Sequence, residues 1–218
     1  MKHKILFIIL IVTSASGAFA QSHQEGTLSF QTGADFGVHG TLYTSSFAGI
    51  QLEKDTSAAV TKMFALSAQY SPLTWLSGGL SFVYGSYLED TADLNANGNN
   101  VGAISLDIRL YPVNTEKFNL YIGPEFGYSF LQISRVNPGL GGLEEVYNYS
   151  GSHFGANLGF NWYFASFIGA FMQLEYTRNG FTLNEYTING EPFNLTNFDI
   201  SLDTFSAGVR FGLSFKIN

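Results

Sequence analysis

Hydrophobic and polar residues alternate strictly over the end of the chain, residues 204–218. One parity is entirely apolar and includes Phe205, Val209 and Phe215, whereas the other combines small residues with cations such as Arg210. A period of two indicates a β-strand with one apolar face. An apolar face backed by small polar residues is typical of a strand between lipid and a narrow barrel lumen. We therefore predict that this strand closes an outer-membrane β-barrel against the first strand of the chain.

Seven earlier stretches repeat this alternation. Each is about ten residues or longer, the length that a tilted transmembrane strand requires. Together with the closing strand, the predicted strands cover residues 27–39, 62–71, 75–87, 101–111, 119–131, 151–164, 167–178 and 204–218. The predicted fold class is all-β, an eight-stranded antiparallel up-and-down transmembrane β-barrel.

The predicted connections between these strands alternate long and short. The long loops are residues 40–61, 89–100, 132–150 and 179–203, and the short turns are 71–74, 112–118 and 165–166. Outer-membrane barrels have short periplasmic turns and long outer loops, so we expect both termini in the periplasm. Pro124 falls on the apolar parity of its strand and lacks an amide hydrogen, which predicts a β-bulge there.

The N-terminus has the pattern of a secretory signal peptide. Lys2 and Lys4 precede an apolar run that ends near Val12, and Ala18-Phe19-Ala20 is a small-x-small cleavage site. The apolar run is too short to cross a bilayer as a helix, which disfavours the alternative of an N-terminal membrane anchor. We expect a signal peptide over residues 1–20 and one outer-membrane β-barrel domain over residues 21–218.

Composition narrows the class further. The chain has no cysteine, which excludes a disulfide framework, a thiolate metal site and a lipid-modified N-terminal cysteine. Charged residues make up 12% of the chain, about half the usual share in soluble domains. The net charge is −7, and it becomes −9 without Lys2 and Lys4. We find no basic stripe that would meet phosphates, so nucleic acid is not an expected partner.

Two features distinguish a membrane barrel from a soluble barrel with its apolar parity inside. The polar parity consists mainly of Gly, Ser, Ala and Asn, whose sizes suit the interior of an eight-stranded barrel. Aromatic residues also gather at the strand ends, as in the girdles of membrane barrels. The predicted periplasmic girdle comprises Tyr70, Trp75, Tyr111, Tyr121, Trp162, Tyr163 and Phe215, and the outer girdle Tyr84, Tyr87, Tyr128, Phe154, Tyr176 and Phe205.

Six charged residues lie on the polar parity and are predicted to face the lumen. Unpaired charges are costly where bulk water is excluded, so we expect these residues to pair. The predicted structural ionic network consists of Asp35, Asp107, Arg109, Glu125, Glu175 and Arg210. A network that fills the barrel predicts a lumen closed to ions, and a gated proton or ion path is the alternative.

Several of these segments resemble a known family. They are Arg109-Leu110-Tyr111-Pro112, the segment that begins Leu120-Tyr121-Ile122-Gly123-Pro124, and the closing Ala207-Gly208-Val209-Arg210-Phe211-Gly212. With the signal peptide, they resemble the small outer-membrane β-barrel domain family, which includes the OmpA, OmpX and OmpW-type barrels and the PorT-like barrels. The resemblance implies an outer-membrane location in a Gram-negative bacterium and eight antiparallel strands. It implies no single function, because the fold hosts adhesins, lipid-modifying enzymes, small channels and secretion components.

The chain departs from this family at its end. Members commonly finish on an aromatic residue, whereas here Phe215 is followed by Lys216-Ile217-Asn218.

The candidate catalytic chemistry is weak. His39 and His153 lie near the predicted outer rim on the lumen parity, and His23 lies in an N-terminal segment that we expect to be flexible. Ser152 precedes His153, but neighbours in a strand point to opposite faces, so the two should not meet. No nucleophile then lies within reach of a base. We predict no enzyme activity, no cofactor and no metal site.

The outer loops are predicted to be acidic and to contain one hairpin. Asn189-Gly190 lies between two apolar-rich runs, the signature of a type I′ turn. We expect the last two barrel strands to continue above the membrane as a protruding sheet that binds another protein. The candidate interaction hairpin comprises Phe181, Tyr186, Asn189, Gly190 and Phe193.

These features favour a non-enzymatic outer-membrane barrel with a structural or surface-interaction role. Its partners would be outer-membrane lipid and another protein at the loops. One alternative is a small transport barrel that passes hydrophobic compounds through a lateral opening near Pro124. A further alternative, an accessory of a secretion system, rests on the family resemblance alone.

Overall fold

The structure is a computed structural model that describes residues 22–89, 99–137, 141–193 and 198–217, so the predicted signal peptide lies outside the described residues. Within these ranges no helix is long and apolar enough to cross a membrane. The strands are β1 Leu28–Phe47, β2 Ile50–Leu73, β3 Leu76–Glu89, β4 Asn100–Asn114, β5 Phe118–Asn137, β6 Leu143–Tyr163, β7 Ile168–Ile188, β8 Glu191–Pro192 and β9 Phe198–Ile217.

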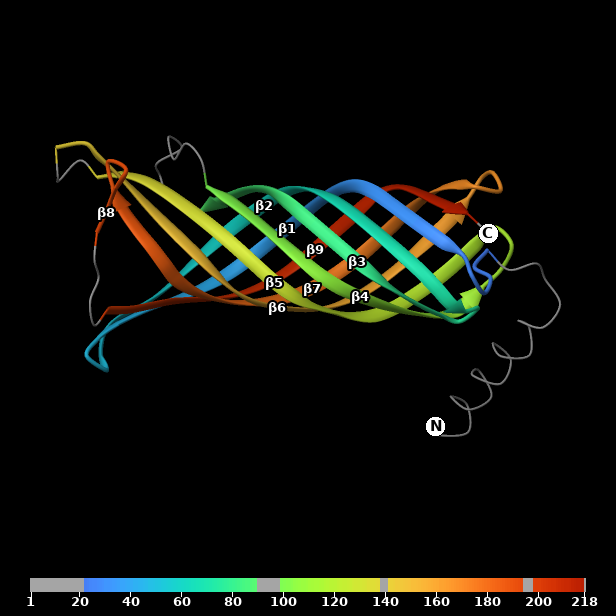
Figure 1. Cartoon of the computed structure of the whole chain (residues 1–218), viewed down its shortest axis with the longest axis horizontal. Helices are drawn as coiled ribbons and strands as arrows, with labels where there is room; N and C mark the ends of the chain where they lie inside the picture. The colour runs from blue at the N-terminus through green and yellow to red at the C-terminus, as the bar shows by residue number, and fades with distance from the viewer. Residues whose placement is uncertain (1–21, 90–98, 138–140, 194–197, 218) are drawn as a thin grey trace.

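The strands form one closed barrel (Figure 1). Consecutive strands from β1 to β7 pair antiparallel, β7 pairs with β9, and β9 pairs with β1 to complete a ring of eight strands. The two-residue strand β8 only extends a hairpin at the end of β7. The predicted eight-stranded barrel is confirmed, and β9 closes it against β1 as its alternation predicted.

The two ends of the barrel differ. At one end, the short-turn end, strands are joined by residues 74–75, 115–117 and 164–167. At the other, the extended end, the strands continue into long hairpins (Figure 1). Lys216 donates a hydrogen bond of 2.8 Å from Nζ to the carbonyl oxygen of Ser22, so both ends of the described chain lie at the short-turn end.

Three of the predicted long loops are largely strand. β1 continues to Phe47 and turns through Ala48 and Gly49, both with positive φ, directly into β2. Residues 132–150 and 179–203 are likewise mostly extended strand, whereas most of 89–100 lies outside the described residues. For residues 179–203 this is the expected continuation of the last two strands. For residues 40–61 and 132–150 the prediction of a loop was wrong, because alternation marks a strand only where its two faces meet different environments.

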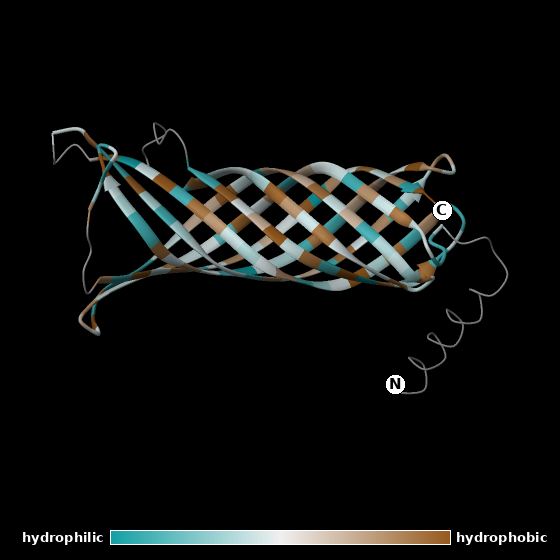
Figure 2. Cartoon of the chain, viewed as in Figure 1, coloured by the Kyte–Doolittle hydropathy of each residue, from teal (hydrophilic) through white to brown (hydrophobic). Residues whose placement is uncertain are grey.

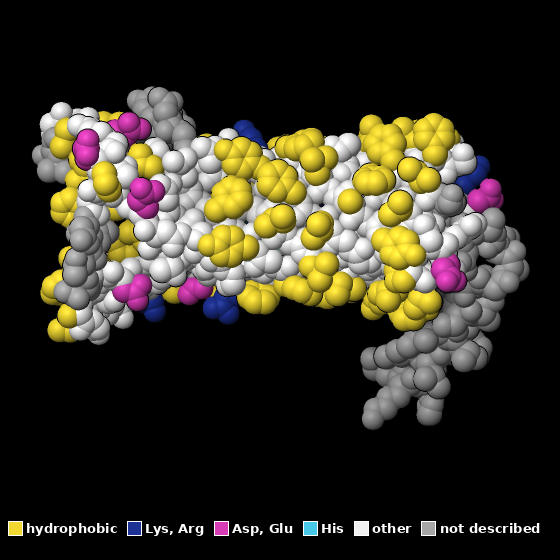
Figure 3. Space-filling model, in the orientation of Figure 1, with side chains coloured by type: hydrophobic (Ala, Val, Ile, Leu, Met, Phe, Trp, Pro, Cys, Tyr) yellow, Lys and Arg dark blue, Asp and Glu magenta, His cyan; other side chains and the backbone are white. Residues whose placement is uncertain are grey.

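The apolar parity faces outward, as predicted. Leu80 on β3 is 59% exposed, whereas Asp35 on β1 is fully buried inside the barrel. Figure 2 shows apolar and polar positions alternating along the strands, and in Figure 3 apolar side chains gather on the barrel wall between charged ends. An exposed apolar surface of this extent fits lipid rather than water.

The predicted aromatic girdles are only partly confirmed. Trp75, Trp162 and Tyr128 are exposed on the outer wall, but four predicted girdle residues point into the lumen and are almost fully buried. Those four are Tyr87, Tyr111, Tyr121 and Tyr163. They occupy the inward parity of their strands, and a glycine on the neighbouring strand makes room for the Tyr121 ring. A Cβ on Gly159, for example, would lie 2.5 Å from the Tyr121 ring.

The predicted bulge at Pro124 is also wrong. Pro124 pairs with Ala156 on β6 in an unbroken register, and on the β4 side the register is the same before and after it. The irregularity between β4 and β5 lies instead between Leu110 and Val113, which flank Pro112. One missing amide hydrogen removes a local ladder bond, but the long ladders on either side keep the register fixed.

Candidate functional site: the barrel interior

Asp107 and Arg109 form the first charged cluster in the lumen. They alternate inward on β4 and lie 2.6 Å apart between Nη2 and Oδ2. The amides of Gln69 and Asn157 each donate a 3.0 Å hydrogen bond to the Asp107 carboxylate. The Arg109 guanidinium also lies 4.4 Å from the centre of the Tyr121 ring. Because both charges are almost fully buried, these partners replace the water that each has lost.

Arg210 forms the second cluster, nearer the extended end. Its Nη2 lies 2.9 Å from Asp35 on β1 and 3.0 Å from Glu175 on β7. Its Nη1 donates a hydrogen bond of 3.2 Å to the Ser81 hydroxyl on β3. One guanidinium thus joins side chains from four strands, and it spans the lumen at this level.

Glu125 takes part in a third group. It accepts a hydrogen bond from the Ser105 hydroxyl, and its carboxylate lies 3.7 Å from Nε2 of His153. Nδ1 of His153 lies 2.7 Å from the Asn179 amide oxygen. All six predicted lumen residues therefore face the interior, divided between the Asp107–Arg109 pair and the groups around Arg210 and Glu125.

The candidate catalytic residues do not come together. His153 is buried in the lumen, whereas Ser152 is exposed on the outer wall, as strand alternation predicted. His39 lies 3.0 Å from the Thr61 hydroxyl. Among the described residues no three His, Asp or Glu side chains are grouped as a metal site requires.

The lumen at the level of Arg210 is filled by side chains. A cavity of about 30 Å³ remains, lined by His39, Ser129, His153 and Arg210 among others. This volume holds about one or two water molecules. The Ser129 hydroxyl is buried without a hydrogen-bond partner within the structure, so a water molecule in this cavity would satisfy it.

The N-terminal segment closes the short-turn end, which sequence reasoning missed. His23 is only 1% exposed, and its ring stacks on Tyr111 with centroids 4.5 Å apart. Asn114 bonds both the amide nitrogen and the carbonyl oxygen of His23. Asn119 donates a 2.9 Å hydrogen bond to the Ser22 hydroxyl. The expectation of a flexible segment was wrong, because inward asparagines supply partners for its backbone.

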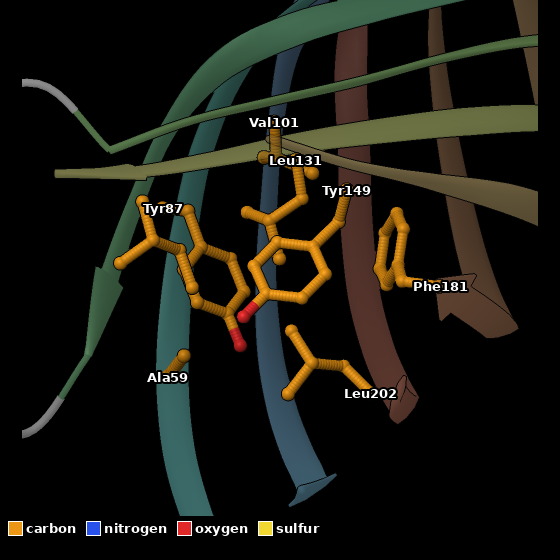
Figure 4. Packing of buried hydrophobic residues seen from close by; sticks show 8 residues of the cluster. Ala59, Tyr87, Val101, Leu131, Tyr149, Phe181 and Leu202 are labelled. Carbon is orange, nitrogen blue, oxygen red and sulfur yellow. The ribbon is translucent and has the colours of Figure 1, made fainter. Parts of the chain in front are cut away.

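The interior becomes apolar toward the extended end (Figure 4). Tyr87, Leu131 and Tyr149 pack there with Phe181 and Leu202. The sequence predicted that Phe181 belongs to an exposed interaction hairpin. This prediction is wrong, because Phe181 is only 2% exposed. Its place on the inward parity of β7 explains this correction.

The rest of the predicted hairpin is built as expected. Asn189 and Gly190 have φ of 51° and 80°, which a type I′ turn requires, and they connect β7 to β8. Tyr186 donates a 2.9 Å hydrogen bond to Glu145, and its ring packs edge-on against Phe193. Phe193 is 54% exposed at the hairpin.

Comparison with known proteins identifies the fold but no sequence relative. No family model matches the sequence, and no curated protein matches it. The outer membrane protein OprG from Pseudomonas aeruginosa has a similar structure, with a TM-score of 0.66 and 14% identity over 90% of this chain and 98% of that chain. The outer membrane protein AlkL, determined in lipid bilayers, has a TM-score of 0.54 and 10% identity over 92% of this chain and 94% of that chain.

The class of protein follows from the fold. The chain has the fold of the small outer-membrane β-barrel proteins, the family that its strand pattern resembles. The similarity to OprG extends over 90% of this chain and 98% of that chain, so this fold accounts for the described barrel.

Proposed function

We propose that this protein is an integral outer-membrane barrel that is closed to ions and acts through its extended strands on the cell surface. The short-turn end then faces the periplasm, as short turns do in outer-membrane barrels. The main support for a closed lumen is the position of Arg210, which links β1, β3 and β7 across the lumen. The Asp107–Arg109 pair and the docked Ser22–His23 segment add two further obstructions.

Conductance in planar bilayers tests the closed state. The purified barrel should show no stable single-channel current. Replacing Asp35, Arg210, Asp107 and Arg109 by Ala and deleting Ser22 and His23 removes all three obstructions and should produce measurable current. Arg178→Ala is the matched control, since Arg178 pairs with Asp203 on the exposed surface. Stable unitary currents from the unaltered protein would refute the proposal.

The surface role is proposed for the β7–β8 hairpin. Phe193 is more than half exposed there, and Tyr186 and Glu145 hold the hairpin against β6. A rigid hairpin with an exposed aromatic residue suits contact with another protein. A photo-crosslinking residue at position 193 should capture a protein partner in intact membranes, whereas one at the lipid-facing Leu174 should capture lipid alone. Capture of lipid alone at both positions would exclude the role.

A second candidate function is passage of hydrophobic compounds. It is supported by the apolar interior around Leu131 and Tyr149 at the extended end. No β4–β5 ladder pair involves Ile108 or Arg109, but a Cβ on Gly123 would lie 1.6 Å from the Ile108 carbonyl oxygen, so a lateral exit here would need these two strands to separate. Liposomes that carry the barrel should then take up a neutral hydrophobic dye faster than empty ones. Equal rates would exclude this candidate.

A further inference from the structure

The extended end holds an open pocket of about 300 Å³, here called the vestibule. It lies above the apolar interior and draws its lining from β1, β2, β3, β5, β6 and β9. The volume is at the lower limit for a small-molecule site. The vestibule is separate from the ionic groups around Arg210, none of which lines it.

The floor of the vestibule is aromatic and aliphatic. Ile133, Tyr149 and Leu202 are each at most 5% exposed, and Tyr43 and Tyr147 are half-buried beside them. The rings of Tyr147 and Tyr149 stack with centroids 6.4 Å apart. Such a floor offers an apolar body both contact area and the negative faces of aromatic rings.

The wall of the vestibule is acidic. Glu53 and Asp55 continue the inward parity of β2 that begins with the buried Ala59 and Thr61. They therefore border the vestibule rather than point away from the barrel. Both side chains are exposed, and both lie in residues 40–61, which were predicted to form an outer loop.

The cations near this wall do not balance its charge. Among the residues that line the vestibule, Arg135 is the single cation, and it pairs with Glu89 at 2.7 Å. Within the described residues no ion pair involves Glu53 or Asp55. Two carboxylates thus face an aromatic floor without a cationic partner, and a protein of net charge −7 adds to the negative potential there.

We propose that the vestibule binds an amphipathic organic cation, a compact apolar or aromatic body that carries a quaternary or protonated amine. The apolar body lies against Ile133, Tyr149 and Leu202. The cation lies between the tyrosine faces and the carboxylates of Glu53 and Asp55, where cation–π attraction and charge act together. The cation–π attraction and the attraction to the carboxylates both select against anions. A neutral molecule of the same shape would gain neither of them. The inference needs neither a closed lumen nor a transport route.

Binding of benzyltrimethylammonium tests the proposal. The full barrel in zwitterionic nanodiscs is titrated by calorimetry, with empty nanodiscs as the baseline for partitioning into lipid. The cation should bind saturably. Neopentylbenzene, the neutral isostere with carbon in place of nitrogen, and benzenesulfonate should bind at least about fivefold more weakly. Equal affinity for the neutral isostere would overturn the proposal, as would failure of the cation to bind.

Paired variants locate the site. Glu53→Gln with Asp55→Asn should weaken binding of the cation about tenfold, because both carboxylates are lost. Glu144→Gln with Asp199→Asn removes the same charge from the same end outside the vestibule, and should change the affinity less than about twofold. Tyr149→Leu should weaken binding of the cation but should leave binding of the neutral isostere unchanged. Equal effects of the two acidic pairs would assign the binding to general surface charge and refute the site.

Discussion

Arg210 and Asp35 are 175 residues apart in sequence and lie directly opposite each other where β9 meets β1. Nε of Arg210 donates a hydrogen bond of 2.9 Å to Oδ2 of Asp35, and both side chains are almost fully buried. The last strand of the barrel therefore brings the cation that neutralises a carboxylate on the first.

Loss of this cation should strongly destabilise the barrel. Arg210→Gln leaves Asp35 and Glu175 buried without their charged partner, which should cost about 3–5 kcal/mol of unfolding free energy. Urea unfolding in detergent micelles, followed by the heat-modifiable gel shift, measures the change.

The matched control for Arg210 is the exposed pair of Arg178 and Asp203, whose side chains are 57% and 43% exposed. Arg178→Gln should cost less than about 1 kcal/mol, because water replaces the partner. Equal costs for the two variants would show that burial of the Arg210 cluster contributes nothing.

Two glycines permit the closest approach at the same seam. Gly33 and Gly212 pair with each other, and a Cβ on either would lie 2.1 Å from a backbone oxygen of the opposite strand. Gly33→Ala or Gly212→Ala should reduce the yield of heat-modifiable barrel, since backbone must shift at a typical cost of about 1–3 kcal/mol. Gly40→Ala is the control, because no atom lies within 4 Å of its added Cβ. Wild-type yields for both seam variants would contradict the prediction.

Docking of the N-terminal segment should weaken in acid. His23 precedes β1, outside the membrane-spanning strands, and burial, followed by the charges of Arg109 and Lys216, lowers the pKa of its imidazole from 6.5 to about 3. The docked state thus binds fewer protons than the released state between these values. Docking should weaken by about 1.4 kcal/mol for each pH unit below 6.5, until the pH reaches about 3.

Chemical shifts of the His23 ring in micelles, followed by NMR against pH, measure this effect. The ring should remain neutral well below pH 6.5 while Ser22 stays docked, and His23→Gln should remove the pH dependence of docking. A ring that titrates near 6.5 with Ser22 still docked would contradict the burial argument.

The two tryptophans should report one membrane interface. Trp75 and Trp162 are 53% and 58% exposed on the outer wall near the short-turn end. Lipids brominated close to the headgroup should quench their fluorescence more than lipids brominated near the acyl ends. Trp75→Phe and Trp162→Phe separate the two signals. Quenching by aqueous acrylamide alone would place this end outside the bilayer.

The directions of side chains were predicted most accurately for strands that have lipid on one side and the lumen on the other. Alternation alone predicts that Phe205 faces outward and that Arg210 faces the lumen, and the structure confirms both. The Asn189-Gly190 turn was predictable for another reason, because its backbone conformation favours those two residue types.

The extended hairpins were not predictable in the same way. Tyr43 and Glu53 lie where both faces of the strand are wet or shared with other side chains, so polar residues occupy both parities there. The inward direction of the four buried tyrosines was not predicted, because an aromatic residue at a strand end can lie either in an outer girdle or in the lumen. Tyr121 faces inward because Gly159 is beside it on the neighbouring strand, a pairing that only register reveals.

The seam between β1 and β9 also orders the folding of the barrel. Its contacts join the two ends of the chain, so they carry the largest cost of loop closure and are expected to form late. Until then Asp35 faces an open, hydrated groove and needs no counter-charge. Closure of the seam removes that water and delivers Arg210 in the same step, so no intermediate has to bury an uncompensated carboxylate.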